Sequence, residues 1–153
     1  MNGAHLHLAL NHFPIILPIV GLGILAVGIF TKSQTVKRTA LVIFMIGAIA
    51  TIGGMSTGEG AEEVVEEISG ISENFIEEHE ETAETFAILS YLLGALSLAG
   101  LWADLKEKKF AQTLQIIILV FSLVVLFFAQ QTGTSGGEIR HTEIRDGAQP
   151  TED

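Results

Sequence analysis

The sequence contains no cysteine among its 153 residues, and charged residues make up only 17% of it. Without cysteine there is no disulfide framework, no thiolate nucleophile and no cysteine-ligated zinc or iron–sulfur centre. Soluble domains usually carry about 25% charged residues. Basic residues are the scarcer kind, because 8 Lys+Arg stand against 18 Asp+Glu. So few cations cannot neutralise many phosphates, which argues against nucleic acid as a partner.

Charged residues and histidine are absent from four long stretches of the chain. A membrane-spanning helix needs about 20 mostly apolar residues, and the expected spans are 13–31, 39–57, 85–103 and 110–130. A soluble bundle is the alternative, but its helices would show a charged face. We therefore expect an all-α protein, an integral membrane up-down four-helix bundle, as one domain over residues 1–145. Residues 131–137 are expected to form a loop, and 146–153 a flexible tail.

Lysine and arginine are distributed unevenly between the connections. The two short links carry six of the eight, and the long connection 58–84 carries none: the six are Lys32, Lys37, Arg38, Lys106, Lys108 and Lys109. Short basic loops face the cytoplasm. No basic residue precedes the first span, which argues against a cleaved signal peptide. The pattern predicts a multi-pass protein of the plasma (inner) membrane with both termini extracytoplasmic.

The long connection holds eleven of the 18 acidic residues. In 61–71 the apolar residues follow helical spacing and the glutamates take the other face. This predicts a short acidic amphipathic helix that caps the extracytoplasmic side, with a calcium or metal site as the alternative. Ser72 resembles the N-cap of the next helix, with Glu73 in its first turn. That helix is expected to continue through the third span to residue 103.

Five histidines are the residues that point most clearly to chemistry, and all lie at or beyond the outer ends of the predicted spans: His5, His7, His12, His79 and His141. At 100° per residue His79 shares a face with Phe75, Ile76 and Phe86. The neighbouring glutamates fall on other faces, so His79 is expected to point into the bundle. The alternative is a structural histidine satisfied by a carbonyl or a water.

His12 lies at the membrane boundary, where an ionisable residue is a functional candidate. Pro14 either begins the first membrane helix or kinks it. Two glycines, Gly136 and Gly137, predict a tight reversal after the last span. That turn would fold the tail back and bring His141 near the other histidines.

Neutral imidazole binds iron, copper, zinc or nickel. A b-type haem held between His12 and His79 fits the apolar setting, and Arg140 and Arg145 would pair with its propionates or with the glutamates. The competing arrangement is a transition metal held by several of His5, His7, His12, His79 and His141. No catalytic residue is assigned, because the sequence has neither a His-Glu-x-x-His motif nor a nucleophile elbow.

Four blocks carry a family resemblance. They are His5-Leu-His7-Leu-Ala-Leu-Asn11-His12-Phe13-Pro14-Ile15, Thr57-Gly58-Glu59-Gly60-Ala61-Glu62-Glu63, Ile76-Glu77-Glu78-His79-Glu80-Glu81 and Gly136-Gly137-Glu138-Ile139-Arg140-His141-Thr142-Glu143-Ile144. Together they resemble a group of small bacterial predicted membrane proteins of unknown function. The group has four helices, an N-terminal His…Asn-His-Phe-Pro signature and a Gly-Gly-x-Ile-x-His element. Some relatives are joined to cytochrome-like modules, so the resemblance implies a redox setting.

The resulting hypothesis is an integral membrane redox or electron-transfer protein that binds b-type haem or a transition metal. Its partners would be the lipid bilayer, a redox partner or larger membrane complex, and a second copy of the chain. The alternative is a non-catalytic accessory or scaffold subunit of a membrane complex. Proton or metal-ion transport is disfavoured because no span has an ionisable residue in its interior.

Overall fold

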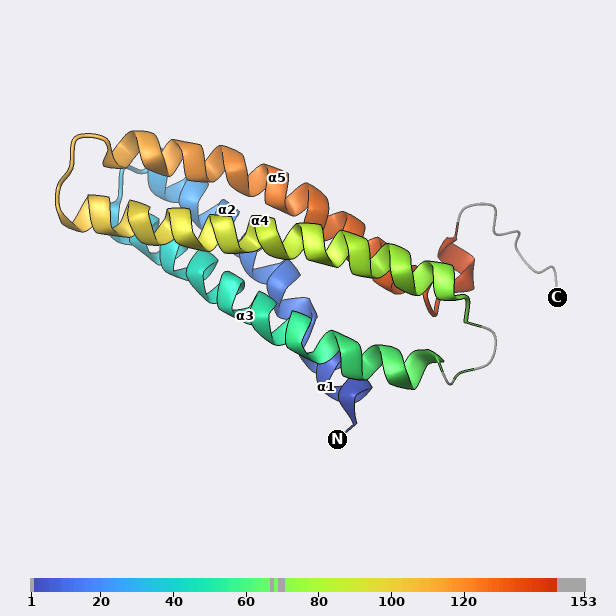
Figure 1. The fold of residues 1–153 in the computed structure, drawn as a ribbon. Helices are drawn as coiled ribbons and strands as arrows, with labels where there is room; N and C mark the ends of the chain where they lie inside the picture. Colours follow the sequence, from blue (N-terminus) through green and yellow to red (C-terminus); the bar gives the residue numbers. More distant parts are fainter. Residues whose placement is uncertain (1, 67, 69–70, 146–153) are drawn as a thin grey trace.

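The computed structural model describes residues 2–66, 68 and 71–145, and the regular elements in these ranges are all helices. Along the chain they are α1 (Gly3–Leu10), α2 (His12–Phe30), α3 (Gln34–Glu66), α4 (Glu73–Leu105), α5 (Ala111–Glu138) and a short 3-10 turn, η1 (Thr142–Ile144). Helices α2 to α5 form an antiparallel bundle (Figure 1). The tail at 146–153 lies outside the described residues.

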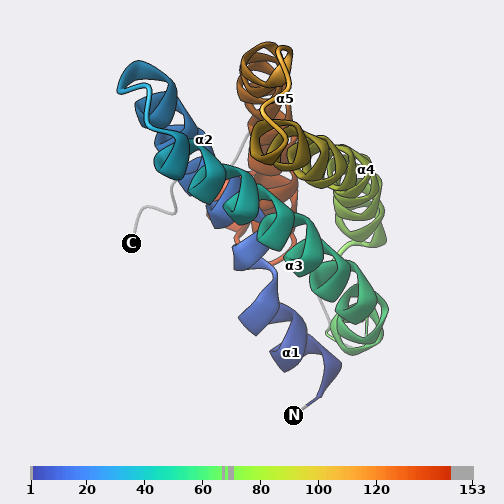
Figure 2. The same cartoon turned by 90° about the vertical axis from the view of Figure 1, so that its left-hand side faces the viewer.

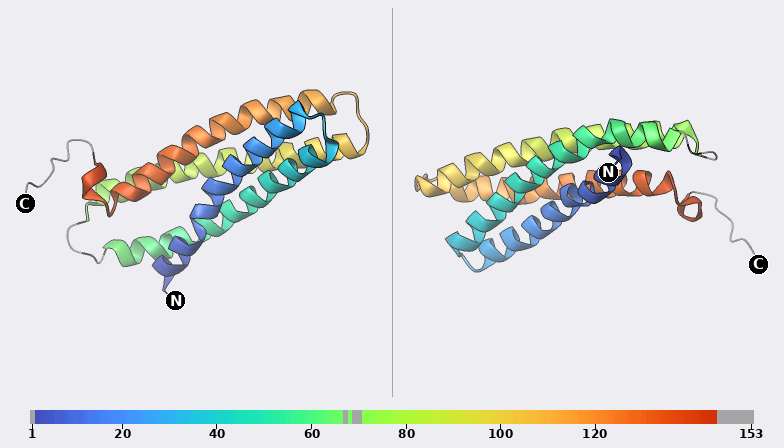
Figure 3. Two further views of the ribbon diagram at one scale, coloured as in Figure 1. Left: turned by 180° about the vertical axis from the view of Figure 1, so that it is seen from behind. Right: turned by 90° about the horizontal axis from the view of Figure 1, so that it is seen from below.

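The bundle has two chemically different ends. The α2–α3 and α4–α5 connections lie at one end, called here the hairpin end, and α1 and the end of α5 lie toward the other, the acidic end (Figures 1 and 3). Four helices are long and apolar enough to cross a membrane, if α1 and α2 are taken as one segment. This confirms the predicted all-α four-helix membrane bundle.

Helices α3 and α4 are longer than one membrane crossing. Each has 33 residues, or about 50 Å at 1.5 Å per residue, against about 30 Å of hydrocarbon. The surplus of both helices lies at the acidic end. The acidic segment is helical, as its spacing predicts, but it continues α3 to Glu66 instead of forming a separate helix. Its remaining residues at 67 and 69–70 lie outside the described ranges.

Helix α4 begins where the sequence predicts. Ser72 is extended and Glu73 is the first helical residue, although the Ser72 side chain makes no capping hydrogen bond. The helix then runs without a break through the third apolar stretch to Leu105.

The chain bends between α1 and α2 (Figure 2). Asn11 ends α1, and Pro14 lies in the first turn of α2. Proline lacks an N–H and its ring clashes with the carbonyl four residues earlier, which here belongs to Leu10. The predicted effect of Pro14 therefore takes the form of a helix break three residues before it.

Helix α5 does not end near residue 130, and the expectation of a loop over 131–137 is wrong. The helix runs to Glu138, so Gly136 and Gly137 are helical. The chain leaves the helix only after them, where the Arg140 and His141 N–H groups both bond the Gly137 carbonyl. The glycines serve close packing, since a Cβ on Gly136 would lie 2.8 Å from His79 Cε1.

Large apolar side chains fill the centre of the bundle, among them Leu25, Leu41, Phe44 and Ile118. Small residues let the helices approach: a Cβ on Gly94 would lie 2.5 Å from that of Ala48. Many other large apolar residues are exposed on the outer surface, as expected where lipid is the solvent. Buried polar side chains also bond across helices, as Thr51 and Ser90 do at 2.9 Å.

Candidate functional site

Two of the five histidines point toward the interior at the acidic end. His7 on α1 and His79 on α4 are half-buried, whereas His5, His12 and His141 are exposed. The inward direction expected for His79 is therefore confirmed. Its partner in the interior is His7, and not the His12 of the sequence-based pair.

His7 is held by α3 through one ring nitrogen. Its Nδ1 lies 3.2 Å from the Gly54 carbonyl oxygen and 3.1 Å from Thr57 Oγ1. A carbonyl only accepts, and the Thr57 hydroxyl donates to the carbonyl of Gly53 or Gly54. Nδ1 is thus the protonated nitrogen. The lone pair of the neutral ring is on Nε2, which is the atom left to bind a ligand.

His79 is held in the same way by α5. Its Nδ1 lies 3.1 Å from Ser135 Oγ, and Ser135 donates to the Thr132 carbonyl at 3.2 Å. The hydroxyl of Ser135 is then an acceptor for the Nδ1–H of His79. Thr82 completes the cluster, with its Oγ1 2.9 Å from Ser135 Oγ and donating to the His79 carbonyl. With the Ser135 proton on the Thr132 carbonyl in this way, Nε2 of His79 carries the lone pair.

Burial keeps both inward histidines neutral. It lowers the pKa of His7, against an opposing hydrogen bond to the Gly54 carbonyl. Burial also lowers the pKa of His79, and the charge of His7 lowers it further, against a bond to the Thr132 carbonyl. The two rings are near enough for their charges to interact. Neutral imidazoles with a free Nε2 are the form that binds a metal.

The glutamates around His79 face away from it. Glu77, Glu78, Glu80, Glu81 and Glu84 are all exposed, as the helical spacing predicts. On α3, burial raises the pKa of Glu62, and repulsion from Glu80, Glu66 and Glu59 raises it further. The acidic ends of α3 and α4 therefore share one negative field, and His7 of α1 and His79 of α4 lie at the same end of the bundle.

The other predicted ligands lie apart from this pair. His12 is exposed in the first turn of α2, and the backbone N–H of the exposed His5 bonds the Asn2 side chain at 3.0 Å. The tail does turn after α5, but His141 stays exposed and its Nδ1 lies 2.9 Å from Glu143 Oε1. That contact and a backbone hydrogen bond lower the pKa of Glu143.

The two predicted cationic residues differ in their surroundings. Arg145 caps α5, because its Nε donates to the Glu138 carbonyl at 2.8 Å and its Nη2 to the Ile139 carbonyl at 3.1 Å. Its guanidinium also lies 4.0 Å from the ring centre of Phe75. Arg140 is exposed, and its side chain has no partner in the part of the chain described. Arg140 is the freer of the two to meet an anionic ligand.

Within residues 2–66, 68 and 71–145, no three His, Asp or Glu side chains lie close enough to hold a metal ion. A cavity of about 310 Å³ borders the partners of His79 and includes Thr82 and Ser135 in its wall. Glu78 and Glu138 also line it, which disfavours a carboxylate-bearing ligand there. The arrangement at the acidic end is a two-histidine site, not a multi-carboxylate one.

Sequence reasoning missed the groups that orient the two rings: Gly54, Thr57, Thr82, Thr132 and Ser135. A signal for some was present, because Ser135 and Thr132 lie three residues apart and share a helical face with Ala129. The burial of that face confirms the pattern, with Ala129 1%, Thr132 8% and Ser135 5% exposed. Which histidine they meet depends on how the helices rotate against each other.

Comparison with known proteins shows a family match over most of the chain. Residues 3–143 match the family described as predicted membrane protein (DUF2231). No curated protein and no solved structure matches the chain. The match covers every described helix, including both inward histidines and the turn after α5. The chain therefore belongs to the DUF2231 family of predicted membrane proteins.

Proposed function

We propose that this chain is an electron-transfer protein that binds b-type haem between His7 and His79 at its acidic end. The observation that carries the proposal is that the two imidazole rings have the same burial and the same hydrogen-bonded nitrogen. Each is half-buried, and each has its Nδ1 engaged by a protein oxygen, which leaves Nε2 free. Metal-ligating histidines are typically oriented in this way, since the bond to the second nitrogen fixes both tautomer and ring direction.

Haem fits this pair better than a bare transition metal. Haem iron needs only one or two axial protein ligands, whereas mononuclear zinc and related sites use three or four. The described residues supply two inward imidazoles and no third ligand within reach. When bound, haem would supply one-electron chemistry. His7 and His79 would hold the haem iron, and Arg140 would be available to pair with a propionate.

The orientation of the chain forms part of the proposal. Six of the eight Lys and Arg residues lie at the hairpin end, which supports placing that end in the cytoplasm. The acidic end, with His7 and His79, would then face the outside of the plasma membrane. The exposed carboxylates there would attract a basic redox partner.

Absorption spectroscopy of the purified full chain tests the proposal. We expect a Soret band that is lost in His7→Ala and in His79→Ala and kept in the control His12→Ala. Loss in His12→Ala with retention in His7→Ala would restore the sequence-based pair and overturn this one. Protein expressed with ample haem that is colourless, and metal-free by elemental analysis, would exclude both the haem and the transition-metal versions.

A second candidate is an accessory or scaffold subunit, favoured by the length of α3 and α4 beyond one membrane crossing. Their acidic ends give a projecting surface with exposed Glu63, Glu66, Glu77 and Glu81. This candidate predicts that a His7→Ala/His79→Ala double variant still co-purifies with a membrane partner. It also predicts that reversing these glutamates to lysine abolishes that co-purification.

A further inference from the structure

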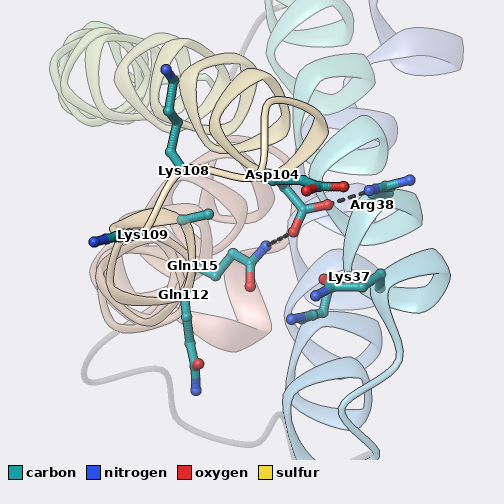
Figure 4. Close-up of a pocket in the computed structure, with 10 residues that line it drawn as sticks. Lys37, Arg38, Asp104, Lys108, Lys109, Gln112 and Gln115 are labelled. Atoms are coloured by element: carbon teal, nitrogen blue, oxygen red, sulfur yellow. Dashed lines mark hydrogen bonds and ion pairs between the residues drawn. The ribbon is translucent and has the colours of Figure 1, made fainter.

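A second polar site lies at the hairpin end, far from the histidines. A cavity of about 380 Å³ is lined by residues of α3, α4, the α4–α5 loop and the start of α5, which are drawn in Figure 4. Four cationic side chains and two carboxylates line it: Lys37, Arg38, Lys108, Lys109, Asp104 and Glu107. The excess of positive charge indicates an anionic ligand.

Lys37 is a cation of the cavity wall without a partner among the described residues. The residue is only 7% exposed, and Gly28 of α2 packs so closely on its stem that a Cβ there would lie 2.7 Å from Lys37 Cγ. The ammonium is not among the buried polar atoms that lack a partner, so the buried stem presents an accessible charge to the cavity. Within the part of the chain that the structure describes, the Lys37 ammonium has no ion pair or hydrogen bond.

The nearby carboxylate does not compensate Lys37, because other groups occupy it. Arg38 Nε donates to Asp104 Oδ2 at 2.6 Å, and Gln115 Nε2 donates to Asp104 Oδ1 at 3.1 Å. Both oxygens of Asp104 thus have donors. Asp104 neutralises Arg38 and leaves the charge of Lys37 unmatched.

Gln115 shows what else the ligand must offer. The residue is 0% exposed, and its Oε1 has no hydrogen-bond partner in the described residues. Figure 4 shows Lys37 and Gln115 on facing walls of the cavity. A group between them must accept from the ammonium and donate to the amide oxygen. A phosphate that carries a hydroxyl or ammonium donor has both properties.

The rim of the cavity fits the edge of a membrane. Trp102 is 51% and Phe110 52% exposed, and aromatic residues concentrate where membrane meets water. Lys108 Nζ lies 5.7 Å from the Trp102 ring centre. Lys108 and Lys109 are exposed and point away from the cavity in Figure 4. Their long side chains can turn toward a headgroup that enters.

We propose that this cavity binds a phosphate group with a neighbouring hydrogen-bond donor, held by Lys37 and Gln115. Such a group is present in the headgroup of phosphatidylglycerol and in free hydrogen phosphate. The position beside exposed Trp102 and Phe110 favours the lipid. This site is independent of the histidine site at the opposite end.

Native mass spectrometry of the full chain in neutral detergent tests the proposal. We expect phosphatidylglycerol to bind at least about tenfold more tightly than diacylglycerol with the same acyl chains. Lys37→Met should remove that preference, and the control Lys106→Met, which removes a lysine after α4 at the same end of the bundle but outside the cavity wall, should retain it. Equal loss in both variants would mean diffuse charge attraction, and equal binding of the two lipids would also overturn the site.

Two further arms complete the test. Competition by millimolar inorganic phosphate, with no lipid preference, would identify a free phosphate as the ligand; a lipid preference without competition identifies the headgroup. Asp104→Asn removes a negative charge from the wall and should tighten phosphate binding several-fold. Weaker binding in a folded Asp104→Asn chain, checked by its thermal melting, would contradict an anion site.

Discussion

Gly136 on α5 lies directly against the imidazole of His79 on α4: a Cβ at Gly136 would come within 2.8 Å of Cε1 and 3.1 Å of Nδ1. The neighbouring Ser135 bonds the same ring through Nδ1. Two consecutive residues of one helix therefore fix the position and the tautomer of a histidine on another. The close approach works only because Gly136 has no side chain.

Gly136→Ala should displace the His79 ring and break its bond to Ser135. Alanine in a helix interior is ordinarily favoured over glycine by about 0.5–1 kcal/mol, so a loss of stability would report the steric conflict. Gly133→Ala is the matched control, because its Cβ would meet only Ile15 at an ordinary 3.5 Å. Thermal melting in detergent should fall for the first variant and hold or rise for the second. Equal behaviour of the two would contradict the contact.

Ser135→Ala should weaken the proposed haem site without removing an axial ligand. Loss of a group that orients a metal-ligating histidine typically costs about 10–100-fold in affinity. Haem titration followed by the Soret band measures this effect. Thr134→Ala, an exposed position next to it on α5, should leave the affinity unchanged. An unaltered affinity in Ser135→Ala would mean that its bond to His79 does not support the site.

The stability of the cofactor-free chain should depend on pH through His7 and His79. In the unfolded chain histidine titrates near 6.5, and burial lowers the pKa of both residues in the fold. Below about pH 6.5 the unfolded state binds more protons than the folded state. Stability therefore decreases as the pH is lowered from about 6.5 toward the lower pKa values of the two histidines in the fold. Above that pH these residues cause no change.

Melting temperatures measured from pH 8 to pH 5 in detergent test this dependence. His7→Gln/His79→Gln should flatten the fall that begins near pH 6.5. The exposed His12 provides the control variant, His12→Gln, which should keep it. A slope that survives in the double variant would assign the dependence to other groups.

Arg38 and Asp104 should be coupled energetically. Asp104 is 7% exposed and accepts from Arg38 and Gln115. Asp104→Asn leaves a half-buried guanidinium without its counter-charge, at an expected cost of about 1–3 kcal/mol. A double-mutant cycle with Arg38→Met, measured by denaturant unfolding in mixed micelles, should give a favourable coupling energy. Additive effects would show that the ion pair contributes nothing to stability.

Lys32 lies two residues after the end of α2 and has a φ of 54°, in the left-handed region. The Ser33 N–H bonds the Gly28 carbonyl at 3.0 Å, which is the helix-ending arrangement that favours glycine. Lys32→Gly should therefore raise stability by about 1 kcal/mol, since the left-handed conformation costs other residues roughly that amount. Thr31→Gly, at a right-handed position, should lower it. The same thermal assay distinguishes the two.

Much of the fold could be predicted from charge and spacing alone. The four spans, the start of α4 at Glu73 and the inward side of His79 all follow from the absence of charge or from helical period. The burial of Lys37, which lines the cavity at the hairpin end, also follows from helical period. Lys37 lies three, four and seven residues before the buried Ala40, Leu41 and Phe44, so it shares their face.

The errors arose where a local signal competed with a distant contact. Two consecutive glycines are typical of a helix end, but Gly136 and Gly137 are both inside α5. Gly136 packs against His79 and Gly137 against Ile144. The proposed haem pair takes the half-buried His7 in place of the predicted His12, which is exposed and lies nearer the membrane. His7 and His12 lie on different helices, because α1 ends before Asn11 and α2 begins after it. Helical period relates the directions of side chains only within one continuous helix. Helix rotation then decides which ring meets His79.

The break at Asn11 also separates α1 from the helix that follows it. Gly3 of α1 crosses Gly60 of α3 so closely that a Cβ on Gly3 would lie 2.2 Å from the Gly60 carbonyl oxygen, and His7 bonds Gly54 and Thr57 of the same helix. Helix α1, Gly3–Leu10, is thus attached sideways to α3. A peptide of this sequence, added to a chain that starts at Asn11, has the contacts it needs to return the missing imidazole to its place.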